Sequence, residues 1–208
     1  MKEFVLGKEG DQPFEINQQG VSRRHAKVSI DDNDNWIVED LGSSNGTYVR
    51  ENDSGELRSL GQNGKVRITP LSFIVLGPDN AKGCGFYARQ LLNPGNFNEE
   101  YEYLNEKEKE FDMRVDKVDN TAQKIKIIIF FVNILIVAYS FSGSSTSFWM
   151  LRIGTLLSTG FAAFYNPTTH IKKINAIRER FHHCPNPACS HRLRPAEIRN
   201  MRCNKCKK

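Results

Sequence analysis

Cysteine is scarce in this sequence, and the residue sets that enzymes use for catalysis are missing from it. Only five residues are cysteine, and four of these lie in the last 25 positions, which excludes a disulfide framework as the basis of the fold. We find no Ser/His/Asp set, no paired core carboxylates and no glycine-rich phosphate-binding loop. We therefore expect a protein that is not an enzyme.

Charge is nearly missing from the middle of the chain, where two apolar runs cover residues 127–141 and 148–165 and Arg152 is the one charged residue. With their polar edges, the runs supply about 20 helical residues each, enough to cross a hydrocarbon core about 30 Å thick. Residues 142–147 between them are glycine, serine and threonine, which suit a short turn. We predict a two-helix transmembrane hairpin over residues 125–167. The alternative is a buried hairpin of a soluble domain, which Arg152 favours because a charge is costly inside a membrane.

Positive charge flanks the predicted hairpin on both sides and is absent from its turn. Lys124 and Lys126 precede it, and a basic group follows it: His170, Lys172, Lys173, Arg178 and Arg180. The positive-inside rule then places both termini in the cytoplasm. We expect no signal peptide, because residues 1–3 lead directly into the strand-like residues 4–6. These features predict an integral protein of the bacterial inner (cytoplasmic) membrane that contacts the lipid bilayer.

Residues 1–93 consist of short alternating segments separated by turn residues, with no convincing helix. The expected strands are 4–6, 13–16, 26–30, 35–39, 47–50, 65–68, 73–76 and 85–91. Asp- and Asn-rich or Gly-rich turns separate them, for example residues 31–34 and 61–64. This pattern predicts an all-β sandwich.

Three polar loops of this region form a joint pattern. Their sequences are Leu-Gly-Lys at 6–8, Val-Ser-Arg-Arg-His-Ala at 21–26 and Asp-Leu-Gly-Ser-Ser-Asn-Gly-Thr at 40–47. Together with Trp36 and Gly64, they closely resemble the signature of the forkhead-associated (FHA) domain. That family is a β-sandwich that binds phosphothreonine peptides through its apical loops, and the resemblance extends over most of the first 93 residues.

The resemblance implies a role for each loop residue that matches the family pattern. Ser22 and Arg23 would hold the phosphate through a hydroxyl and a guanidinium, and an arginine–phosphate pair is a strong, charge-assisted hydrogen bond. Ser44 would supply a second hydroxyl. Asn45 would hold the peptide backbone beside the phosphothreonine. For these residues, ordinary turn formation is the alternative.

The other loop residues would shape the site, and one of them departs from the family. Gly7 and Gly46 allow the turns, and His25 matches a residue that braces the binding loop. Where the family usually has Gly-Arg in the first loop, this chain has Gly7-Lys8. Lysine keeps the positive charge but lacks the fork of two N–H donors that arginine presents to phosphate.

An acidic helical linker is predicted over residues 94–124. Apolar residues recur at heptad spacing within residues 104–125: Leu104, Phe111, Val115, Val118, Ala122 and Ile125. Glu108 occupies an a position and weakens the N-terminal part of this seam. The pattern indicates either a solvated stalk helix or a parallel coiled-coil homodimer.

Two small modules are predicted after the hairpin. Residues 168–183 read as a basic amphipathic helix that lies along an anionic membrane surface. Residues 184–208 resemble a zinc ribbon, with two cysteine pairs as ligands of one structural zinc ion: Cys184, Cys189, Cys203 and Cys206. The first pair has four intervening residues where two are usual. A mixed site that uses a histidine in place of one cysteine is the alternative, with three candidates: His182, His183 and His191.

These patterns lead to three functional hypotheses. The first is a membrane-anchored adaptor that binds phosphothreonine-containing proteins in cytoplasmic Ser/Thr kinase signalling. The second is a phosphorylation-independent scaffold in a membrane assembly, which the Lys8 departure keeps open. The third is nucleic-acid binding by residues 170–208, whose net charge is +9. We do not expect nucleic acid, because topology already explains the basic residues and no aromatic residue for base stacking follows Phe181.

Overall fold

The structure, a computed structural model, describes residues 1–50, 54–78, 82–140, 154, 166–189 and 191–208. These residues group into two compact units. The first unit combines Met1–Glu108 with Ile177–Lys208, and the second is Lys109–Ala176. The C-terminal segment therefore belongs to the same unit as the N-terminal domain, although the second unit separates them in sequence.

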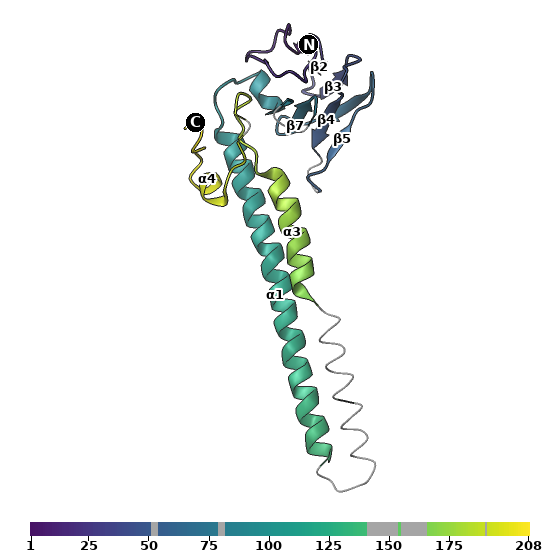
Figure 1. Cartoon of the computed structure of the whole chain (residues 1–208), viewed down its shortest axis with the longest axis vertical. Coiled ribbons are helices and arrows are strands. Elements are labelled where there is room, and N and C mark those ends of the chain that lie inside the picture. The colour runs from purple at the N-terminus through teal and green to yellow at the C-terminus, as the bar shows by residue number, and fades with distance from the viewer. Residues whose placement is uncertain (51–53, 79–81, 141–153, 155–165, 190) are drawn as a thin grey trace. The chain divides into compact units, whose positions relative to one another are not determined.

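In the described residues, eight strands form two antiparallel sheets, and seven of them overlap strands expected from the sequence (Figure 1). One sheet has the order β1-β2-β3-β6 and the other the order β5-β4-β7-β8. The strands are Lys2–Leu6 (β1), Ala26–Ile30 (β2), Trp36–Asp40 (β3), Thr47–Arg50 (β4), Leu57–Ser59 (β5), Lys65–Ile68 (β6), Phe73–Leu76 (β7) and Cys84–Tyr87 (β8). The predicted β-sandwich is confirmed.

The core lies between the two sheets and follows the alternation of the strands. In β2, Ala26, Val28 and Ile30 are buried, whereas the residues between them are half-buried. Val28 pairs with Val38 of β3, so both side chains point to the same face of the sheet. Trp36 lies in the same core with only 2% of its surface exposed.

Three details of the strand prediction differ from the structure. Residues 13–16 form no strand, because the Gln12 side chain donates to the carbonyls of Gly7 and Phe14 and holds this segment as a loop. The strand expected at 85–91 ends at Tyr87, and a 3-10 helix, η1 (Ala88–Leu91), follows it. The short β5 at the sheet edge was not predicted.

The strand β7 is buried on both of its faces. Ile74 and Leu76 belong to the core between the sheets. Phe73 and Val75 lie on the opposite, outer face, where they form a second apolar cluster with Tyr87. Three half-buried side chains pack against this outer cluster: Tyr48, Leu57 and Tyr103. The sheet β5-β4-β7-β8 therefore needs a cover on its outer face.

A single long helix, α1 (Asn98–Ser140), runs through the predicted linker into the first apolar run. Within the described residues it is the one helix long and apolar enough to cross a membrane. Its apolar end is exposed, with Phe130 at 61% and Leu135 at 68%. The second apolar run lies outside the described residues except for Gly154, which lies so close to Ile136 of α1 that a Cβ would stand 2.5 Å from it.

The expected seam of α1 is buried in part, since Val115, Val118 and Ile125 are only half-buried. Leu104, Phe111 and Ala122 are each at most 5% exposed. The two carboxylate oxygens of Glu108, on the same seam, share the Arg178 Nε–H at 2.9 and 3.0 Å, and Oε1 lies 2.6 Å from His182 Nε2. Although burial acts against ionisation, the hydrogen bonds from His182 and Arg178 lower the pKa of Glu108 to about 2. Glu108, which we expected to weaken a coiled-coil seam, is thus a buried carboxylate paired with Arg178.

The C-terminal segment contains two further helices. α3 (Pro167–Phe181) occupies the stretch predicted as a basic helix, and α4 (Pro195–Arg199) is a short helix between the two cysteine pairs. Arg178 of α3 and His182 after it contact Glu108 of α1, so the end of α3 lies beside the beginning of α1 in the first unit. These contacts join the C-terminal segment to the α1 residues of the first unit.

Candidate functional site

The first predicted loop is held in a shape that only glycine permits. Gly7 has a φ of +151°, and a Cβ at this position would stand 2.2 Å from the carbonyl oxygen of Arg23. Gln12 fixes the peptide on both sides, since its Oε1 accepts from the Gly7 N–H and its Nε2 donates to the Gly7 carbonyl. The close approach of two backbones explains why glycine precedes Lys8.

Backbone hydrogen bonds join this loop to the second one. The Lys8 N–H donates to the Ser22 carbonyl at 3.2 Å, and the Glu9 N–H donates to the Arg23 carbonyl at 2.9 Å. The Lys8 and Arg23 side chains are both exposed. The Arg23 guanidinium lies 3.9 Å from the Glu9 carboxylate, and 79% of its side chain is accessible. Two cations are therefore held on neighbouring loops and remain open to a ligand.

His25 connects the second loop to the third. Its ring is fully buried. The Ser22 N–H donates to Nδ1 at 3.0 Å, and Nε2 lies 2.9 Å from the Gly46 carbonyl. Nδ1 must therefore be the acceptor and Nε2 the donor, which is the arrangement of a neutral imidazole. Burial lowers the pKa of His25, although the Gly46 hydrogen bond and the Asp40 charge act in the opposite direction.

The Asp40 carboxylate holds the third loop in place by hydrogen bonds. Its Oδ1 accepts from the N–H groups of Gly42 and Ser43, and its Oδ2 accepts from the hydroxyls of Ser43 and Thr47 at 2.7 and 2.6 Å. Burial alone would raise the pKa of this carboxyl, but the hydrogen bonds from Ser43 and Thr47 outweigh burial and lower it. A charged, fully hydrogen-bonded carboxylate thus fixes the loop that presents Ser44.

The structure brings the second and third loops into direct contact at the predicted site. The Ser44 N–H donates to the Ser22 Oγ at 3.4 Å, so the two predicted hydroxyl residues are neighbours. Asn45 is exposed, and its Nδ2 donates to the Gly20 carbonyl at 2.9 Å. Gly46 has a φ of +77°, and its carbonyl accepts from both the His25 Nε2 and the Gly77 N–H.

Two residues that organise the site were not predicted from the sequence. Asp40 ends β3 and reads as an ordinary turn former, although its position three residues before Ser43 allows an Asx turn. Gln12 has no distinctive signal, because its partner Gly7 becomes adjacent only in the folded loop. Both act on backbone geometry and not on a ligand.

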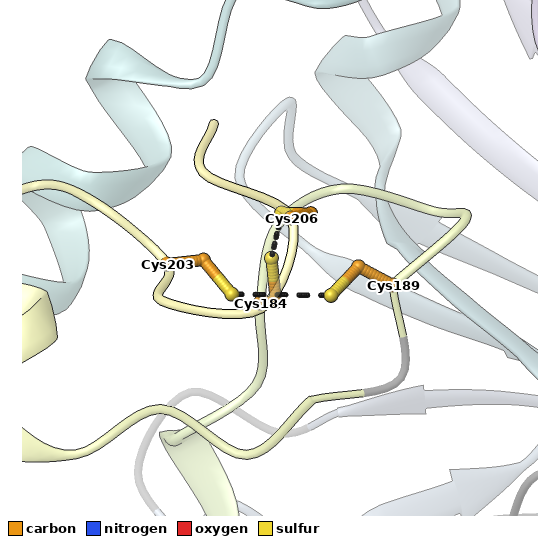
Figure 2. Close-up of side chains that lie close together, drawn as sticks. All are labelled: Cys184, Cys189, Cys203 and Cys206. Carbon is orange, nitrogen blue, oxygen red and sulfur yellow. Dashed lines mark hydrogen bonds between the residues drawn. The ribbon is translucent and has the colours of Figure 1, made fainter.

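The four C-terminal cysteines form a second candidate site. Their Sγ atoms lie within 4.8 Å of one another and point towards a common centre (Figure 2). The Cys184–Cys206 and Cys189–Cys203 sulfur distances are 3.7 and 3.9 Å, too long for disulfides. Zinc–sulfur bonds of about 2.3 Å in a tetrahedron give sulfur–sulfur edges of about 3.8 Å. The geometry fits a tetrahedral four-thiolate metal site.

The histidines considered as alternative ligands have other contacts. His182 contacts Glu108, and His183 Nδ1 lies 3.1 Å from both Arg50 and the Arg180 carbonyl. Burial, with the nearby charges of Arg50 and Arg192, lowers the pKa of His183 to about 3. His191 lies 3.3 Å from Glu197, and these two with Cys203 form a second, mixed group.

Burial also affects the thiols themselves. It raises the pKa of Cys184, and it raises that of Cys189 to about 11. A metal must therefore displace protons from these thiols, and its affinity falls as the pH is lowered.

Residues 4–75 match the family model described as the FHA domain. Similar solved structures include the FhaA FHA domain complexed with the intracellular domain of Rv3910, which is 28% identical, with coverage of 36% of this chain and 71% of that chain and a TM-score of 0.28. They also include the FHA domain of the CT664 protein from Chlamydia trachomatis, at 24% identity, 36% and 68% coverage and a TM-score of 0.27. The comparison with curated proteins gives no match.

Proposed function

Because residues 4–75 are an FHA domain, we propose that this protein is a membrane-anchored adaptor that binds phosphothreonine-containing proteins in cytoplasmic Ser/Thr kinase signalling. The observation that carries the proposal is the bridge made by His25. By joining Ser22 to Gly46, its buried ring holds the second and third loops together and keeps Ser22 next to Ser44. Residues of FHA-type binding loops thus form one preorganised surface.

The chemistry of this surface suits a phosphate dianion attached to a peptide. Arg23 and Lys8 are exposed cations on joined loops, and the hydroxyls of Ser22 and Ser44 add donors for phosphate oxygens. Asn45 has an amide oxygen and a second N–H in addition to the N–H given to Gly20, so it can still bond a peptide backbone. The hydrogen-bonded loops are in place before the ligand arrives, which limits the entropy lost on binding.

Arg23 and Arg24 form a matched pair for testing this proposal. Both are exposed and adjacent, but the resemblance assigns only Arg23 to the phosphate. A binder would first be selected from an oriented phosphothreonine peptide library. Loss of one charge-assisted hydrogen bond costs about 1.5–3 kcal/mol, so Arg23→Ala should weaken binding roughly 10- to 150-fold. Arg24→Ala should leave the affinity within about twofold, because it would remove no hydrogen bond to the phosphate and salt screens much of the remaining charge effect. Equal losses in the two variants would contradict the assignment of Arg23.

A phosphorylation-independent scaffold is the second candidate, and two observations favour it. Lys8 stands where the family usually has arginine, and the Asn45 amide already donates to Gly20 within the domain. Lysine lacks the fork of arginine, and the Gly20 bond uses one of the two Asn45 N–H groups, so both features leave fewer donors for a phosphopeptide. A partner protein that binds equally well before and after phosphatase treatment would support this alternative.

We propose that the apolar end of α1 is the first helix of a membrane hairpin over residues 125–167. Its exposed apolar side chains and its length support membrane insertion. Single cysteines at Ser144 and at Ser190, on a background without other thiols, would test the topology. An impermeant thiol reagent added to intact cells should label only the Ser144 site. Equal labelling of both sites, or extraction of the protein by carbonate, would contradict the hairpin with two cytoplasmic termini.

We also propose that Cys184, Cys189, Cys203 and Cys206 hold one structural zinc ion. Four protein thiolates fill its coordination sphere, so the ion would supply folding energy and leave no position for catalysis. Metal analysis of the purified chain should find about one zinc per chain. Cys203→Ser should lose it, whereas His191→Ala should retain it. Loss of zinc only in the histidine variant would favour the mixed site instead.

A further inference from the structure

The outer face of the sheet β5-β4-β7-β8 is unusually apolar for the surface of a sandwich. Phe73 and Val75 of β7 and Tyr87 of β8 are each at most 4% exposed, although they point away from the core between the sheets. The half-buried side chains that pack against these three residues are Tyr48, Leu57 and Tyr103. None of them belongs to the core cluster between the sheets. An antiparallel sheet with two apolar faces must be covered on both.

The beginning of α1 supplies the first part of this cover. The Tyr103 ring packs against the Tyr87 ring, with 6.3 Å between their centroids. Tyr101 is 2% exposed, and its hydroxyl donates to the carbonyl of Lys208 at 3.1 Å. The helix therefore contacts both the sheet and the last residue of the chain.

The C-terminal segment supplies the second part. The His183 ring lies 5.6 Å from the Phe73 ring, and the Arg50 guanidinium lies 4.1 Å from the centre of the same Phe73 ring. Phe181, 3% exposed, packs against Gly55 so closely that a Cβ there would stand 2.8 Å from its ring. Arg180 donates to the Ser54 carbonyl and pairs with Glu56, both at 3.0 Å.

The cysteine cluster lies at the points where this segment contacts the sandwich. Cys184 directly follows His183, and the Cys84 thiol of β8 lies 3.9 Å from the Pro187 carbonyl, between the first two ligands. The Cys203 N–H donates to the Lys208 carbonyl, which also accepts from Tyr101. A metal at the cluster would therefore fix each stretch that covers the outer face.

We propose that the FHA domain is completed by the far end of the chain, so that its folding unit is residues 1–108 together with residues 177–208, closed by the metal. This inference rests on the proposed metal site. It implies that residues 1–93 alone expose Phe73, Val75 and Tyr87. It also implies that loss of the metal destabilises a binding domain whose own sequence contains no metal ligand.

The test uses the full chain in detergent micelles with Trp149→Phe. The sequence has two tryptophans, so this variant leaves Trp36, in the sandwich core, as the one tryptophan whose fluorescence reports unfolding. A zinc chelator should lower the midpoint of the Trp36 thermal transition by more than about 5 °C. A midpoint unchanged within about 1 °C, while amide exchange of residues 184–206 accelerates, would overturn the proposal.

A second variant separates the cover from the metal. Phe181→Ser removes an apolar contact but no ligand, so it should lower the Trp36 midpoint with the zinc content retained. Met113→Ser is the matched control, because Met113 is 64% exposed and its replacement should change the midpoint little. Equal midpoints in the two variants would overturn the discontinuous folding unit. A chain that holds no zinc would overturn the part assigned to the metal, whatever the Phe181 result.

Discussion

Replacing His25 with alanine is a perturbation whose cost follows directly from the contacts of the ring. In the described part of the chain, the His25 Nδ1 is the one acceptor of the Ser22 N–H, whereas the Gly46 carbonyl also accepts from Gly77 at 2.9 Å. Alanine therefore leaves the N–H of the half-buried Ser22 without this partner, at a cost of about 1–3 kcal/mol. The cavity left by the ring adds about 1–2 kcal/mol. A loss of about 2–5 kcal/mol should lower the midpoint of thermal unfolding by roughly 10–20 °C.

Two conservative variants make this prediction sharper. In His25→Asn, the amide oxygen of the new side chain can take the place of Nδ1 and accept from Ser22. In His25→Gln, the longer side chain can instead take the place of Nε2 and donate to Gly46. Since only the Ser22 N–H loses its sole partner, His25→Asn should recover more stability than His25→Gln. Trp36 fluorescence in the Trp149→Phe background would measure the midpoints. A glutamine variant as stable as the asparagine variant, or an alanine variant within about 2 °C of the parent, would refute this reasoning.

Three further predictions follow from neighbouring contacts. Asp40→Ala should destabilise the domain by about 2–4 kcal/mol in denaturant titrations, because it frees several buried donors, whereas Asp40→Asn should cost less than half as much. Because burial lowers the pKa of His25 in the folded chain, the unfolded chain takes up this proton first as the pH falls below about 6.5, so stability should fall there with a slope up to about 1.4 kcal/mol per pH unit steeper than that of His25→Asn. Lys8→Arg should tighten binding of a selected phosphothreonine peptide several-fold in calorimetry if Lys8 reaches the phosphate, and no change would remove Lys8 from the site.

Much of the sandwich could be predicted because its strands alternate. Residues 26–30 and 35–39 place apolar side chains on one face, and burial in the structure follows that pattern. The loop motifs at 21–26 and 40–47 were sufficient to identify the FHA domain at residues 4–75. Strand β5, with three residues at a sheet edge, has too short a pattern to be recognised.

The cover of the outer face was missed although the sequence contains a signal for it. The run Phe73-Ile74-Val75-Leu76 is continuously apolar, which is typical of a strand buried on both faces. The C-terminal part of the cover could not be identified from the sequence, because it lies about a hundred residues further along the chain. For the same reason, Glu108 read as a weak point of a heptad seam and not as the partner of Arg178 and His182.

The central claim, that these loops bind phosphothreonine, is tested most directly by one calorimetric comparison. The full chain, in detergent micelles and loaded with zinc, would be titrated with a library-selected phosphothreonine peptide and with the same peptide unmodified. Loss of the charge-assisted contacts to phosphate predicts that the unmodified peptide binds at least about 100-fold more weakly. Equal affinity for the two peptides would contradict phosphothreonine recognition by these loops.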